Sequence, residues 1–87
     1  MQAYLQKFIV QVPIKISKIL KKININEKGI VFVVDKNLKI EGSISDGDIR
    51  RYLLRGGKLS KIIKLSSSLI NKKIIIKDSK SSIEEIL

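Results

Sequence analysis

The hydrophobic pattern of the chain changes within the first 23 residues from that of a strand to that of a helix. Residues 8–12 (FIVQV) form a short apolar run that predicts a strand, and Pro13 ends it because proline cannot donate a ladder hydrogen bond. After the proline, apolar residues recur at intervals of three and four, while lysines take most of the other positions: Ile16, Ile19, Leu20 and Ile23. This spacing predicts an amphipathic helix over residues 14–23.

The next segment predicts a loop followed by two strands. Asn24, Asn26 and Gly29 are residue types common in caps and turns, so we expect the helix to end among them. Residues 30–34 (IVFVV) are apolar at every position, which predicts a strand buried on both faces. A polar turn leads to residues 40–45 (IEGSIS), whose alternation predicts an antiparallel partner strand. Gly42 inside this strand suggests a bulge or a close approach of another backbone.

A second helix is predicted over residues 46–55. Ile49, Tyr52 and Leu53 are spaced by three and four, and the glycines at positions 56 and 57 provide the usual stop. The elements therefore follow a β-α-β-β-α order. We expect a small α/β fold in which both helices pack on one side of the sheet.

The end of the chain repeats the theme of its beginning. After a connector over residues 58–72, a short apolar strand over residues 74–76 leads to a polar turn. Ser81 and Glu84 then have the spacing of a capping box at a helix start. Because ISKIL and IEEIL place their apolar residues alike, residues 73–87 are interpreted as the start of a second copy of the unit, truncated after its first helical turns.

The composition constrains size and partners. A chain of 87 residues has room for one small domain, and with 5% aromatic residues its core must consist of Ile, Leu and Val. A domain of this size buries only about 60% of its surface, which favours self-association. The formal net charge of +10 raises nucleic-acid binding as a hypothesis. Lysines are, however, spread from Lys7 to Lys80, and few aromatic residues are available to stack on bases.

The residue types that are missing exclude several kinds of chemistry. With no cysteine and no histidine, the chain has no disulfides, no thiolate or imidazole metal ligands, and no Cys- or His-based nucleophilic catalysis. No apolar run approaches the ~20 residues of a membrane span, and no signal-peptide pattern opens the chain. We therefore expect a cytoplasmic protein that does not associate with membranes.

The polar stretch from Gly42 to Asp48 is the candidate site, and its residues admit three interpretations. The first is purely structural: Ser45 caps the helix over 46–55 and Asp48 completes a capping box. In the second, a helix N-terminus and the Ser45 hydroxyl bind phosphate, Asp48 accepts from sugar hydroxyls, and Gly42 allows a planar group against its backbone. In the third, Asp46 and Asp48 hold magnesium, although neighbouring arginines compete for both carboxylates.

The stretch GIVFVVDKNLKIEGSISDGDIRRYLL resembles the motif of CBS domains, a β-α-β-β-α unit. The ligand signature of that family is glycine, an apolar pair, Ser or Thr, two residues and then Asp. It falls here on residues 42–48, with Ser43 as a departure from the usual aliphatic residue. The resemblance implies that Gly42, Ser45 and Asp48 form a ligand site, with Ser45 on phosphate and Asp48 on the ribose of an adenine nucleotide (AMP, ADP or ATP).

The resemblance covers residues 8–57 as one CBS motif, within a first unit over residues 1–57, and residues 73–87 as the start of a second. The DGDIRR form is similar to the CBS pair that precedes a nucleotidyltransferase domain in bacterial sugar-nucleotide enzymes, and to the pair that follows the isomerase domain in sugar-phosphate isomerases. A motif that begins within ten residues of Met1 favours the transferase arrangement. The nucleotidyltransferase glycine-rich signature does not occur in the chain, so the resemblance implies a regulatory module rather than an enzyme.

Three functions remain open from the sequence. The first is a regulatory module that binds an adenine nucleotide and has neither a metal nor a cofactor of its own. The second is a basic domain that interacts with nucleic acid, and the third is an assembly element that binds no ligand. In each case we expect a homodimer or a larger homo-oligomer, because the apolar stripes of the helices exceed what one copy can cover.

Overall fold

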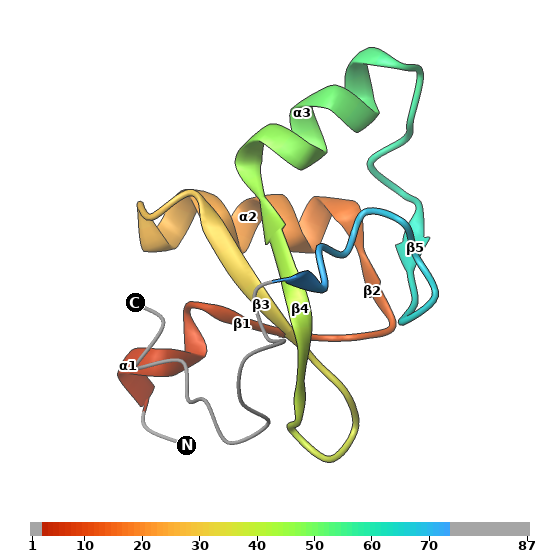
Figure 1. Ribbon diagram of the computed structural model, residues 1–87. Helices are drawn as coiled ribbons and strands as arrows, with labels where there is room; N and C mark the ends of the chain where they lie inside the picture. The colour runs from red at the N-terminus through yellow and green to blue at the C-terminus, as the bar shows by residue number, and fades with distance from the viewer. Residues whose placement is uncertain (1–2, 74–87) are drawn as a thin grey trace.

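The computed structural model describes residues 3–73, which form an α/β fold built on a three-stranded sheet (Figure 1). The strands are β1 (Ile9–Gln11), β3 (Ile30–Val34) and β4 (Ile40–Ser45), in the order β1-β3-β4. β1 and β3 run parallel, with Ile9 opposite Phe32, whereas β3 and β4 form an antiparallel pair. The α/β class and the three strands predicted from the hydrophobic pattern are thereby confirmed.

The sheet is buried on both faces, as the continuous apolar run of β3 predicts. Val31 and Val33 point into the main core beneath the helices. Phe32 and Val34 point to the opposite face, where Leu5 and other apolar side chains cover them. This second cover includes a short helix that the sequence pattern did not predict, α1 (Ala3–Gln6).

The first long helix, α2 (Ile16–Asn26), buries the predicted apolar stripe against the sheet. It starts two residues later than the predicted residue 14, because Ile14–Lys15 forms a separate short strand, β2. β2 pairs antiparallel with β5 (Ile62–Ile63), with Ile14 opposite Ile63. The prediction of helix at these two residues was wrong because their pairing partner lies far along the chain, where no local pattern reveals it.

The end of α2 also differs from the prediction, since Asn24 and Asn26 lie inside the helix. The Asn26 side chain is 6% exposed, and its Nδ2 donates to the carbonyls of Lys7 and Ile30 at 2.9 and 3.0 Å. Its Oδ1 accepts from the amide of Lys28 at 2.8 Å. Asn26 therefore joins the end of the helix to β3 and to the turn that precedes β1. The residue type alone does not distinguish this tertiary role from a place in a loop.

The second long helix, α3 (Asp46–Leu54), lies on the same side of the sheet as α2 (Figure 1). Ile49 of α3 and Ile19 of α2 belong to one core with Val31 and Val33 of the sheet. The predicted second helix and the one-sided packing of the two main helices are confirmed. At the C-terminal end of α3, Gly56 adopts a φ of +93°, which fits the predicted glycine stop.

Residues 58–72, predicted as a connector, are attached to the body at two points. At the first point, the amides of Ile16 and Ser17 donate to the carbonyls of Lys61 and Leu59, respectively, both at 2.9 Å. At the second, Asn71 exchanges two backbone hydrogen bonds with Ser43 of β4, at 2.8 and 2.9 Å. The segment thus runs across the edge of the sheet as a strap, which we call the 58–72 strap.

The predicted second motif falls almost entirely on residues 74–87, which lie outside the described residues. The proposed strand over residues 74–76 and the Ser81–Glu84 capping box belong to this part of the chain. Within residues 3–73, no helix combines the length and the apolar character needed to cross a bilayer.

Candidate functional site

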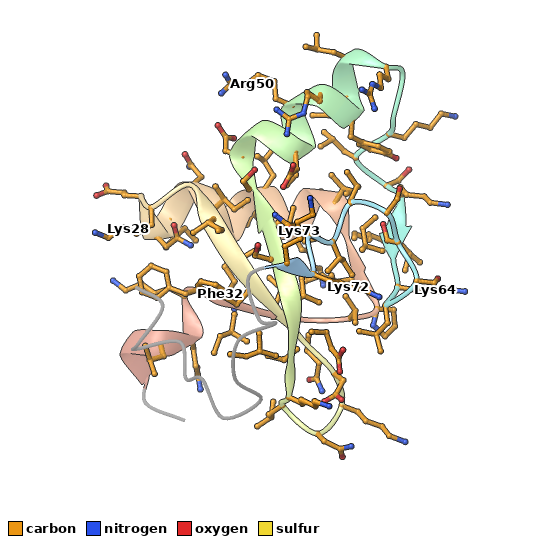
Figure 2. The ribbon with its side chains drawn as sticks, in the orientation of Figure 1. Lys28, Phe32, Arg50, Lys64, Lys72 and Lys73 are labelled. Atoms are coloured by element: carbon orange, nitrogen blue, oxygen red, sulfur yellow. The ribbon has the colours of Figure 1, made fainter. Side chains whose placement is uncertain are left out.

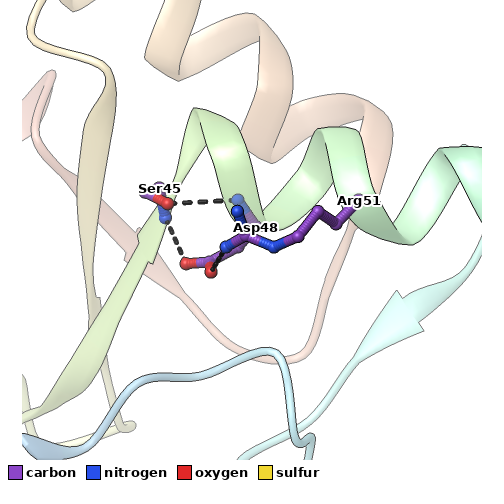
Figure 3. A network of polar contacts seen from close by, with 3 residues as sticks. All are labelled: Ser45, Asp48 and Arg51. Atoms are coloured by element: carbon purple, nitrogen blue, oxygen red, sulfur yellow. Dashed lines mark hydrogen bonds and ion pairs between the residues drawn. The ribbon is translucent and has the colours of Figure 1, made fainter.

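The turn from β4 into α3 forms a complete capping box (Figure 3). The Ser45 hydroxyl accepts a hydrogen bond from the amide of Asp48 at 3.1 Å. The Asp48 carboxylate accepts in return from the amide of Ser45 at 2.9 Å. Its second oxygen accepts from Arg51 Nη2 at 2.8 Å, one turn further along the helix. The structural interpretation of these residues is therefore correct, and the local sequence explains the start of α3.

These contacts also set the charge of Asp48. Partial burial raises the pKa of this carboxyl, but the hydrogen bonds from Ser45 and the Arg51 guanidinium outweigh it and hold the pKa below its ordinary value. Asp48 is consequently an ionised acceptor at neutral pH. Because the Ser45 hydroxyl uses its oxygen in the cap, its proton can still be donated to a further acceptor. Capping and ligand binding are thus compatible at both residues.

Asp48 also lines a cleft of about 350 Å³ between α3 and the 58–72 strap. The charged and serine side chains that line it are Asp48, Arg51, Arg55, Lys61, Ser67 and Ser68. The Tyr52 side chain contributes an aromatic wall, and its hydroxyl is held by the amide and the carbonyl of Lys58 at 3.0 and 3.2 Å. The cleft has the size of a small-molecule site and combines one acceptor with several donors.

Asp46 is directed to a different place from Asp48. It lines a separate cleft with Gly29 and Asn24, and its carboxylate pairs with Arg50 Nη2 at 2.8 Å. Within residues 3–73, no three side chains of the kinds that bind metals form a group. Because the two carboxylates line different clefts and each has an arginine partner, the geometry does not favour magnesium shared between them.

Gly42 occupies a position that a side chain could not share with the strap. A Cβ atom on Gly42 would lie 2.5 Å from Ile70 Cγ2 and 2.6 Å from the Asn71 carbonyl oxygen. The register of β4 also shifts here, so that Val33 faces Gly42 while Val34 faces Ile40. Both the bulge and the close backbone approach that this glycine predicts are present, and the approaching backbone belongs to the chain itself. Gly42 does not line the cleft at Asp48.

The positive charge of the described residues is dispersed rather than concentrated. Figure 2 shows Lys28 and Lys64 at opposite sides of the molecule, with Lys72 and Lys73 between them. The cleft beside α3 gathers Arg51, Arg55 and Lys61 around one carboxylate and two serines.

Sequence reasoning found Asp48 but missed the rest of the cleft. The sequence pattern indicates Arg51 only as a competitor for a metal, and Ser67 and Ser68 only as part of the connector over residues 58–72. Arg55 and Lys61 carry no local signal, because their proximity depends on the path of the 58–72 strap.

Neither the models of known protein families nor the curated proteins include a match to this chain.

Proposed function

We propose that this chain is a regulatory module of the CBS type that binds an adenine nucleotide in the cleft beside α3. One observation carries the proposal: Asp48, an ionised acceptor, lines the same cleft as Arg51, Arg55 and Lys61. An acceptor suits the vicinal hydroxyls of a ribose, and guanidinium and ammonium groups suit phosphate. The resemblance of residues 42–48 to the CBS ligand signature supports the role of Asp48, whereas Gly42 and Ser45 of that signature do not line this cleft.

The contacts already made by Asp48 leave room for this role. Each carboxylate oxygen has two lone-pair sites, and each accepts one hydrogen bond, from Ser45 or from Arg51. Both oxygens can therefore accept one more bond from a sugar hydroxyl. The existing bonds hold the carboxylate in one orientation, which lowers the entropic cost of binding.

We further propose that the module regulates an enzyme and has no catalysis of its own. The similarity of DGDIRR to the CBS pairs of bacterial sugar-nucleotide enzymes favours a nucleotidyltransferase as the regulated partner, with a sugar-phosphate isomerase as the alternative. The lack of cysteine suits a reducing cytoplasm, where we place the module. A genomic sequence that joins this chain to neither type of enzyme would contradict the assignment of the parent.

Calorimetric titration with AMP, ADP and ATP tests the nucleotide site. We expect binding by the natural chain and a loss of about tenfold or more in affinity on Asp48→Ala, since hydrogen bonds to charged groups contribute about 1.5–3 kcal/mol. Asp46→Ala is the matched control, because it removes another carboxylate from the same helical turn. The Asp46 carboxylate also pairs with an arginine at 2.8 Å, but it lines the other cleft.

Because Asp48→Ala also removes a helix cap, the helix content of each variant is checked by circular dichroism. Asp48→Asn supplies a second test, since it keeps an acceptor for the Ser45 amide while losing the charge. Nucleotide affinity that is unchanged in both Asp48 variants, or equally reduced in Asp46→Ala, would overturn the assignment of this site. Tight DNA binding that weakens steeply with salt, without nucleotide binding, would favour the nucleic-acid hypothesis instead.

A further inference from the structure

Among residues 3–73, two cations of the cleft lack the acidic partner that the third one has. Within the described part of the chain, the ion pairs are Arg50 with Asp46 and Arg51 with Asp48. Arg51 therefore balances the single carboxylate of the cleft, whereas Arg55 and Lys61 take part in neither pair. The cleft keeps two positive charges that are free to meet an anionic ligand.

The two residues project from separate walls whose backbones are fixed. The Arg55 amide donates to the carbonyls of Arg51 and Tyr52 at 3.1 and 3.2 Å, which anchors it at the end of α3. On the strap, the Lys61 carbonyl accepts from Ile16 at 2.9 Å, and its amide donates within the strap at 3.1 Å. Because the backbones are anchored and the side chains are exposed, both cations are accessible to a ligand between the walls.

Serine hydroxyls extend the donor set between these walls. Ser67 Oγ accepts from the amide of Leu69 at 3.1 Å, which orients the side chain and leaves its proton for a further acceptor. Ser68 lines the same cleft. Donors from two serines and two cations match the many non-bridging oxygens of a polyphosphate better than the three of a single phosphate.

We infer that Arg55 and Lys61 form a phosphate-selecting pair, so that the cleft prefers small molecules with two or more phosphate groups over monophosphates. The inference rests on the proposed nucleotide site and specifies its ligand class. One phosphate contributes a charge of up to about −2, which two cations can neutralise only in part when they lie on different walls. A diphosphate or triphosphate spans both walls and meets each cation with its own phosphate.

A structural role is the competing explanation for Arg55, because a cation at the C-terminal end of a helix stabilises the helix dipole. That role affects folding alone and does not depend on the ligand. Lys61 has no such position, since it lies on the strap just before β5. Phosphate selection predicts that affinity depends on the number of phosphates, and that replacing either Arg55 or Lys61 removes this dependence. A role in helix stabilisation alone does not predict this loss.

The experiment titrates the full chain with adenosine, AMP, ADP, ATP and inorganic pyrophosphate. We expect affinity to rise with phosphate number, and Lys61→Gln and Arg55→Gln each to lower ATP affinity about tenfold while changing AMP affinity less than about threefold. Lys64→Gln is the matched control. It removes the same charge three residues beyond Lys61 in the strap, at an exposed position that does not line the cleft.

The outcomes distinguish the inference from the proposed function. Equal affinity for AMP, ADP and ATP, all sensitive to Asp48→Ala, would overturn the phosphate-selecting pair and leave the nucleotide site in place. Pyrophosphate binding that depends on Lys61 and Arg55, without binding of any nucleotide, would support the pair and contradict the nucleotide proposal. ATP affinity that falls equally in Lys64→Gln would show a general charge effect and overturn the inference.

Discussion

Replacing Gly42 by alanine tests the attachment of the 58–72 strap to the sheet. The added Cβ would lie 2.6 Å from the Asn71 carbonyl oxygen, a backbone atom that cannot rotate away as a side-chain end can. It would also lie 2.5 Å from Ile70 Cγ2. We therefore expect the strap to move off β4 rather than the strand to absorb the methyl group.

The magnitude follows from the contacts that this movement breaks. The two backbone hydrogen bonds between Ser43 and Asn71 contribute about 0.5–1.5 kcal/mol each. Ile70 is 5% exposed and would lose part of its burial, worth about 1.5–3 kcal/mol when complete. The reduced entropy of the unfolded chain opposes these losses by about 0.4–1 kcal/mol. The expected net loss of unfolding free energy is about 1–3 kcal/mol.

Urea denaturation followed by circular dichroism measures this loss as a lower midpoint. Gly47→Ala is the matched control, since its Cβ would meet the end of the flexible Arg51 side chain at 3.4 Å and Ser45 Oγ at an ordinary contact distance of 3.7 Å. There we expect no loss, and a gain of up to about 1 kcal/mol from helix propensity. A Gly42→Ala variant as stable as the natural chain, with the Asn71 amide still protected from hydrogen exchange, would refute the close approach of the strap to β4.

Further predictions concern the cap, the buried asparagine and assembly. Ser45→Ala should lower the unfolding free energy by about 1 kcal/mol through loss of the helix cap, measured by urea denaturation. Because the pKa of Asp48 is lower in the folded than in the unfolded protein, its carboxylate stabilises the fold above its ordinary value of 3.8, and this contribution is lost as pH falls through the folded value. An Asp48→Asn variant should therefore lose less stability than the natural chain between neutral and acid pH. Asn26→Ala should cost about 2–4 kcal/mol, since it leaves two backbone carbonyls without their donor, whereas the exposed Asn24→Ala should be near neutral in the same assay. Finally, we expect a homodimer in sedimentation experiments, weakened by Leu59→Glu in the apolar groove beside α2; a folded monomer at high micromolar concentration would contradict it.

The sequence by itself determined the elements whose causes are local. The continuous apolar run of β3 requires cover on both faces, and the structure supplies it. The spacing of Ser45 and Asp48 encodes a capping box within four residues, so the start of α3 could be read directly. Gly42 signalled a close approach, because only a residue without a side chain fits under another backbone.

Only the tertiary structure decided what lies opposite these elements. Ile14 belongs to a strand rather than a helix because it pairs with Ile63. Asn26 continues a helix because β3 and the turn before β1 provide its hydrogen-bond partners. The candidate site shows the same division. Asp48 is placed by its own helix, but Lys61 joins it only because the strap returns to β2 and β4. Contacts between distant segments depend on which apolar surfaces meet when the chain folds, and no period within a single segment records that choice.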